Sequence, residues 1–217
     1  MAVAFRKGEM TKIKNYRVTL RPREIARWLK KERGLETTPE LELLIEAGAR
    51  EAKAWVRPAA VYTTMTRQTA EKMTAVPLPS DAVALSIAAV SIGPALERER
   101  LASESGSPRE MLLAALGQEA LAQALQFAVR LIGEQAKEED CEMSPPVSIH
   151  EAPAASALAT LLGMSRIGIV LDTSNSELPS YARVSYVFWT PMKKGSSRNS
   201  AAGTPASRQA GAEKVAA

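Results

Sequence analysis

The sequence predicts an α+β fold, a twisted, mainly antiparallel or mixed sheet packed with helices. Strand-like segments are separated by pairs of helices instead of alternating strictly with them, which argues against a doubly wound parallel sheet. At 217 residues, of which 46% are hydrophobic, the chain is long enough to bury one sizeable core. No Pro/Ser-rich linker interrupts the middle, so one domain is expected over 16–190, between a flexible basic N-terminus at 1–15 and a disordered basic tail at 191–217.

Apolar residues at helical spacing, together with start and stop signals, predict five helices. Pro22 suits a first helical turn and Gly34 a helix end. Thr38 before Pro39 is a hydroxyl cap, as is Ser107 before a proline. The predicted helices cover 22–34, 38–57, 96–101, 107–137 and 153–162.

Period-two patterns and β-branched content predict the strands. The turn-prone stretch 67–72 indicates a hairpin between two of them, and the polar 172–180 connection indicates that the last two form an antiparallel pair. The charge-free 82–92 stretch is typical of a strand buried on both faces. The predicted strands cover 16–20, 60–66, 73–78, 82–92, 166–171 and 182–189.

The net charge of +4 does not by itself indicate a nucleic-acid or membrane partner. Residues 1–17 and 191–217 each carry +4, which leaves −4 for 18–190. Phosphate binding needs a basic face on the folded domain, so solvated tails are the favoured interpretation and a nucleic-acid arm the alternative. No signal peptide and no long apolar run is present, which predicts a cytoplasmic protein that does not span a membrane.

Few residues suggest chemistry. Cys141 is the one cysteine, so it forms no internal disulfide, and its acidic neighbours disfavour a thiolate. The motifs GxGxxG, GK[ST], HExxH and GxSxG are absent. His150 is either a pH-tuned donor or base, or a surface histidine paired with Glu151. Trp28, Trp55 and Trp189 either stack on a flat cofactor or pack in the core, and core packing is favoured.

Several phrases occur in a particular order along the chain. They are REIARWL at 23–29, a Thr-Pro-started helix leading into RPAAVY at 57–62, SIGPALER at 91–98, a long Ala-rich helix, Ser144-Pro145, and SRIGI at 165–169 leading into LDTS at 171–174. In this order they resemble the activation domain of cobalamin-dependent methionine synthase and its short stand-alone relatives, over roughly residues 18–190.

The resemblance implies a function. Domains of this family bind S-adenosylmethionine and present it to a corrinoid carried by another domain or protein. One electron from a flavodoxin-like donor, together with the methyl group, then restores methylcobalamin from oxidised cobalamin. The implied partners are therefore a corrinoid-binding protein or methionine synthase core, and a flavodoxin-like electron donor.

The donor loop of the family resembles Arg-x-x-Pro-Gly-Tyr, and the matching stretch here is 142–147, EMSPPV. Ser144 and Pro145 match, whereas Glu142, Pro146 and Val147 replace the arginine, glycine and tyrosine. A carboxylate at 142 repels the methionine carboxylate that an arginine would pair with.

The resemblance assigns cofactor binding to Ser144 and Pro145. His150 is a further candidate by its own chemistry, and Arg57 and Tyr62 either grip a carboxylate or corrin amide or are ordinary rim residues. Three hypotheses follow. The chain is an S-adenosylmethionine-dependent module that helps to reactivate a partner methyltransferase, a non-catalytic descendant that docks onto a corrinoid protein, or an unrelated small-molecule binder on the same scaffold.

Overall fold

A computed structural model of the chain describes residues 10–149, 157–158, 160–171 and 178–192. The described strands form a six-stranded sheet in the order β1-β2-β3-β6-β4, with β5 also paired to β6. Every pairing in this sheet is antiparallel, which confirms the predicted fold class. The strands are β1 Thr11–Lys14, β2 Ala59–Thr66, β3 Ala84–Ser91, β4 Cys141–Met143, β5 Val147–Ser148 and β6 Ala182–Pro191.

The helices predicted to begin at 22, 38, 96 and 107 each begin within one residue of those positions, whereas the start of the helix predicted at 153 lies outside the described residues. The Thr38 hydroxyl accepts a hydrogen bond from the N–H of Leu41, and that of Ser107 accepts one from Glu110. Gly34 ends the first helix in the left-handed conformation, with φ of 67°. The helices are α1 Pro22–Arg33, α2 Pro39–Ala52, α3 Arg67–Met73, α4 Ala95–Ala102, α5 Pro108–Glu138 and the 3-10 helix η1 Met164–Ile167, and residues 157–158 and 160–162 are also helical.

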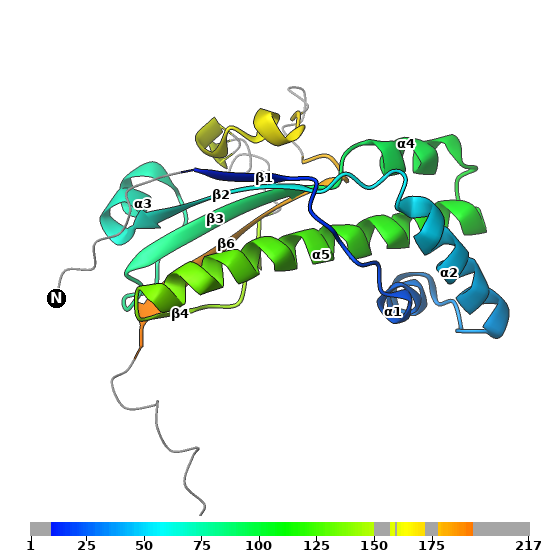
Figure 1. Cartoon of the computed structure of the whole chain (residues 1–217), viewed down its shortest axis with the longest axis horizontal. Helices are drawn as coiled ribbons and strands as arrows, with labels where there is room; N and C mark the ends of the chain where they lie inside the picture. The colour runs from blue at the N-terminus through cyan, green and yellow to red at the C-terminus, as the bar shows by residue number, and fades with distance from the viewer. Residues whose placement is uncertain (1–9, 150–156, 159, 172–177, 193–217) are drawn as a thin grey trace, which may run out of the picture.

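The sheet lies between two helical layers (Figure 1). Residues such as Ala60 and Tyr62 on β2 pack in the core shared with α5, whereas Val61 and Met65 pack in a second core with η1 and the 157–162 segment. Because both faces of the central strands are covered, all eight residues of β3 are buried. This explains the charge-free run in the sequence.

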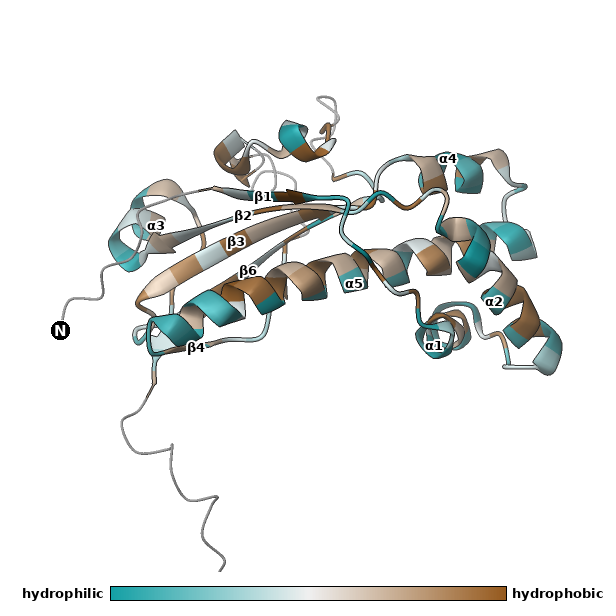
Figure 2. Ribbon diagram, viewed as in Figure 1, coloured by the Kyte–Doolittle hydropathy of each residue, from teal (hydrophilic) through white to brown (hydrophobic). Residues whose placement is uncertain are grey.

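Helix α5 is longer than the sheet is tall. Its 31 residues extend about 46 Å at 1.5 Å per residue. The eight residues of β3 cover only roughly 27 Å. The N-terminal part of α5 therefore projects past the sheet, where it contacts α1, α2 and α4 (Figure 2). By length and composition α5 is the one described helix that could cross a membrane, and 50% of its most apolar window is buried in this fold.

The predicted strand at 16–20 is wrong. Asn15, with φ of 56°, turns the chain out of the sheet after β1, and its N–H donates to the Pro58 carbonyl at 2.9 Å. The segment Tyr16–Leu20 then crosses α5 in an extended form, so every second side chain faces the helix and the period-two pattern arises without strand pairing. The sheet itself begins at Thr11, inside the predicted flexible segment 1–15, whereas the division into one domain and two tails stays a prediction.

The predicted strands at 73–78 and 166–171 are also wrong, and so are the two pairings built on them. Residues 67–73 form α3 instead of a turn, because Thr66 caps the helix. Gly163 and Gly168, both with positive φ, flank the short turn of η1, and the apolar residues around it are buried without pairing. The partners of β6 are β3, β4 and β5.

Candidate functional site

The stretch that matches the family's donor loop forms one broken edge strand. Met143 of β4 pairs with Trp189, and Val147 of β5 pairs with Tyr186. Between these two pairs, three residues of the edge (144–146) lie opposite two residues of β6 (187–188). One extra residue in an edge strand is a β-bulge, a feature that often occurs beside functional sites. The bulge contains Pro145 and Pro146, which have no N–H and are tolerated because this edge has no further strand among the described residues.

Ser144 holds this bulge in register. Its N–H donates to the Phe188 carbonyl at 2.9 Å, and its hydroxyl accepts a hydrogen bond from the Phe188 N–H at 3.0 Å. The same hydroxyl lies 3.1 Å from the Pro145 carbonyl, to which it donates. The Ser144 side chain therefore replaces the strand pairing that the prolines interrupt, and its one donor hydrogen is already used by the fold.

The rest of the loop does not fit S-adenosylmethionine in the family's manner. Glu142 is exposed on β4 and places a carboxylate where an arginine would pair with the methionine carboxylate. Pro146 offers no N–H to a ligand, and the 41% exposed Val147 has no hydroxyl. No residue from 142 to 147 supplies a cation, so this stretch lacks the group that holds the ligand's carboxylate in the loop that it resembles.

The other predicted site residues do not join this loop. Arg57 is exposed, and its guanidinium donates to the carbonyls of Lys53 and Val56 at 3.4 and 3.2 Å. Ser144 is hydrogen-bonded to Phe188, which the strand register aligns with Leu85 of β3 and, through it, with Met65 of β2. Arg57 lies eight residues before Met65, just ahead of the start of β2. This separates Arg57 from Ser144 by roughly 27 Å along the strands. His150 lies outside the described residues.

Tyr62 is buried on the α5 face of the sheet. Its hydroxyl accepts a hydrogen bond from the Gln135 side chain of α5 at 3.3 Å. The strand register aligns Tyr62 with Ala88 and Ser185, and Ser185 pairs with Ser148 of β5, where the two hydroxyls are 3.3 Å apart. Three strand spacings separate Tyr62 from Ser148, roughly 14 Å, so Tyr62 does not contact the donor loop.

The tryptophans and the cysteine have structural roles. Trp189 is buried in the core, and Trp28 and Trp55 pack against the same core, which confirms core packing over a stacking platform. Cys141 is buried, and burial followed by the charges of Glu139 and Asp140 raises the pKa of its thiol. The prediction of an unreactive thiol is therefore supported by its surroundings.

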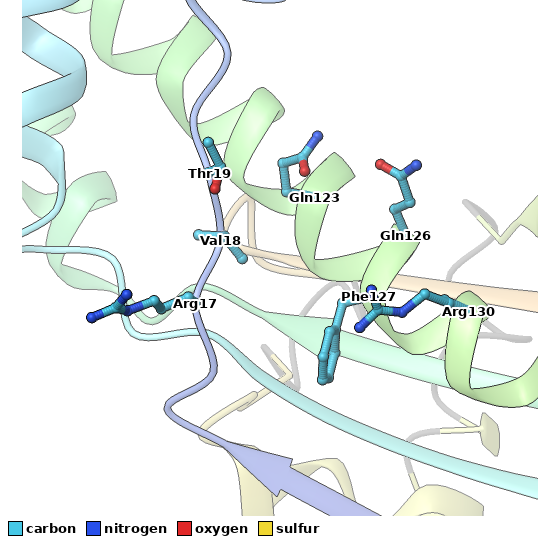
Figure 3. A pocket seen from close by; sticks show the side chains of 7 residues that line it. All are labelled: Arg17, Val18, Thr19, Gln123, Gln126, Phe127 and Arg130. Atoms are coloured by element: carbon cyan, nitrogen blue, oxygen red, sulfur yellow. The ribbon is translucent and has the colours of Figure 1, made fainter.

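A groove that the sequence did not predict lies between the 16–20 segment and α5 (Figure 3). Its volume is about 380 Å³, within the range of small-ligand sites. Two arginines, two glutamines and a phenylalanine contribute to its walls and no carboxylate does; its lining residues are Arg17, Val18, Thr19, Gln123, Gln126, Phe127 and Arg130. The two walls are about a hundred residues apart in sequence, so no local motif could have revealed the groove.

A larger hollow of about 860 Å³ lies between α1 and α2. Both cations and carboxylates line it; Arg27 is paired with Glu24 at 2.7 Å, and Arg21 is paired with Glu119 of α5, which lies outside the hollow, at 2.7 Å. Because these charges neutralise one another, the hollow has no evident preference for an ionic ligand.

Comparisons with known proteins agree with the fold. No family model and no curated protein sequence matches the chain. Among solved structures, the crystal structure of the MetH reactivation domain bound to AdoHcy matches with a TM-score of 0.57 at 12% sequence identity. The match covers 90% of this chain and 82% of that chain. The likeness shows that the two chains share a fold, which is the fold that the sequence phrases predicted.

Proposed function

We propose that this chain is a corrinoid-associated module, a cytoplasmic protein that docks onto a corrinoid-binding partner such as a methionine synthase core. The observation that supports it best is the likeness of nearly the whole chain to the MetH reactivation domain. The ordered sequence phrases support the same family independently of the structural comparison.

Between the two forms of this function, the donor loop favours docking without methyl donation. The exposed Glu142 and the missing hydroxyl at Val147 remove contacts to the donor's carboxylate, and the Ser144 hydroxyl already donates its hydrogen to the Pro145 carbonyl. The fold that would meet the partner is retained. We therefore favour a non-catalytic assembly or protective factor over a module that supplies a methyl group.

Size-exclusion chromatography with a methionine synthase core that lacks its own reactivation domain tests the docking function. We expect co-elution with the cobalamin-loaded core. Separate elution under reducing and oxidising conditions alike would overturn the proposal.

Isothermal titration calorimetry with S-adenosylmethionine separates the two forms. We expect no heat of binding from the natural chain and detectable binding from the double variant Glu142→Arg/Val147→Tyr. Glu138→Arg, which reverses an exposed charge at the end of α5, is the matched control and should stay silent. Micromolar binding by the natural chain would refute the non-catalytic form.

The second candidate is a module that binds S-adenosylmethionine and assists remethylation of an oxidised corrinoid, with an electron from a flavodoxin-like donor. The observation in its favour is that the structurally similar MetH domain was crystallised with AdoHcy. Restored turnover of an oxidised methionine synthase core upon addition of this chain, S-adenosylmethionine and reduced flavodoxin would support it. Unchanged turnover would remove it.

A further inference from the structure

The segment Tyr16–Leu20 presents an extended backbone that is fixed but unpaired. Tyr16 stacks on Phe127 of α5 with ring centroids 4.1 Å apart, and at the other end Arg21 binds Glu119. Between these anchors, the peptide groups of residues 17–19 make no hydrogen bond to any part of the chain that the structure describes. Because successive residues of an extended chain direct their N–H and C=O groups to opposite sides, this segment offers free backbone groups along both of its edges, as an unpaired strand does.

The groove beside this segment carries a positive charge. Arg130 lies over the Phe127 ring, 5.5 Å from its centroid, and its ion pair with Glu134 is long, at 4.0 Å, with both side chains more than half exposed. An ion pair of this kind contributes little, so the Arg130 guanidinium keeps most of its capacity to bind another anion. Arg17 has no carboxylate within ion-pair distance among the described residues.

The groove also offers amide groups along the same line of α5. Gln126 is exposed and makes no hydrogen bond with the described residues, while Gln123 uses its N–H to hold Glu119 at 3.1 Å and keeps its carbonyl oxygen available. Figure 3 shows these two side chains on the α5 wall, opposite Val18 and Thr19 on the extended segment. Polar donors, a cation and a free backbone therefore line one continuous channel.

We infer that this groove binds an extended acidic peptide segment of a partner protein. The peptide adds as a strand along residues 17–19, exchanging backbone hydrogen bonds with them. One carboxylate of the peptide meets Arg130 on the α5 side, a carboxylate on the opposite face meets Arg17, whose side chain points away from α5 (Figure 3), and polar side chains of the peptide meet Gln126. A small anion satisfies the arginines but leaves the free N–H and C=O groups of the segment unpaired, so the backbone favours a peptide.

Selection from a library of short random peptides displayed on phage tests the inference. The full chain is the bait, and the double variant Arg17→Gln/Arg130→Gln is used for counterselection. We expect enriched peptides that carry Asp or Glu on both faces of the extended strand, one facing α5 and one facing away from it. Failure to enrich any peptide on the natural chain over the double variant would overturn the inference.

Fluorescence anisotropy with an enriched, labelled peptide then identifies the contacts. Arg130→Gln should weaken binding about tenfold, as expected for loss of a charge-assisted hydrogen bond. Gln126→Glu, which adds a carboxylate at an exposed position, should weaken it too. Arg98→Gln is the matched control and should leave the affinity unchanged, because Arg98 of α4 is exposed and has no ion-pair partner among the residues that the structure describes.

N-methylation of alternate peptide nitrogens distinguishes strand addition from simple charge attraction. We expect binding to be lost upon methylation of nitrogens that face residues 17–19. If the methylated peptide binds equally well, or if glutarate at the same carboxylate concentration displaces the peptide completely, the groove is a small-anion site and the inference is refuted.

Discussion

The Arg21–Glu119 ion pair joins the start of α1 to the middle of α5, and removing its arginine should destabilise the fold. The Glu119 carboxylate lies 2.7 Å from Arg21 Nε and 3.3 Å from Nη2, and it also accepts hydrogen bonds from the Arg21 N–H and from Gln123. The Glu119 side chain is only 5% exposed, whereas that of Arg21 is 47% exposed. The change Arg21→Ala therefore leaves a buried carboxylate without its cation.

The expected cost follows from this asymmetry of burial. Loss of one partner of a fully buried pair costs about 3–5 kcal/mol. Here Arg21 is half exposed, and both the backbone N–H and Gln123 remain as donors, so water and the residual hydrogen bonds offset part of the loss. We expect Arg21→Ala to lower the free energy of unfolding by about 2 kcal/mol.

Urea unfolding followed by tryptophan fluorescence measures this cost. Arg27→Ala is the matched control, because Arg27 pairs with Glu24 at the same 2.7 Å on the same helix but is 73% exposed. It should cost no more than about 0.5 kcal/mol. Adding Glu119→Gln to Arg21→Ala should restore part of the stability, since a neutral amide is easier to bury. If Arg21→Ala costs no more than Arg27→Ala, the argument from burial is refuted.

Three further outcomes are expected. Gly117→Ala should raise the melting temperature, because alanine favours the helix by about 1 kcal/mol and its Cβ would lie 3.6 Å from Leu96, an ordinary contact; a fall would show that Leu96 cannot yield. Ser144→Ala should cost about 1 kcal/mol in urea unfolding through the lost hydrogen bond to the Phe188 N–H, and a cost no larger than that of an exposed serine such as Ser105 would contradict its role in the bulge. Burial raises the pKa of the Cys141 thiol in the folded state, so the folded chain keeps a proton that the unfolded chain loses, and stability should fall as pH rises above about 8.5. Cys141→Ala should show a shallower alkaline decline, and identical pH profiles would contradict this assignment.

The sequence predicted the helices better than the strands because helix signals are local. Ser107 and Thr38 act on residues three positions away, and the structure confirms both caps. Alternation of apolar residues has no such local cause. At 16–20 it arises because the segment crosses α5, and near η1 because apolar side chains around a turn are buried.

The site was predictable only in part for a similar reason. The replacement of the donor-loop residues could be read directly from 142–147. The bulge could not, because it appears only when the spacing of Met143 and Val147 is compared with that of Trp189 and Tyr186 on a distant strand. The separation of Arg57 from Ser144 likewise depends on the register of three strands.

The two borders of the sheet carry residues that discourage self-association. Lys12 and Lys14 are exposed along β1, and on the opposite border two consecutive prolines interrupt β4 and β5. A second copy that approached either border would meet like charges on one side and missing N–H groups on the other. We therefore expect concentrated solutions of this protein to resist fibre formation through edge-to-edge pairing of strands.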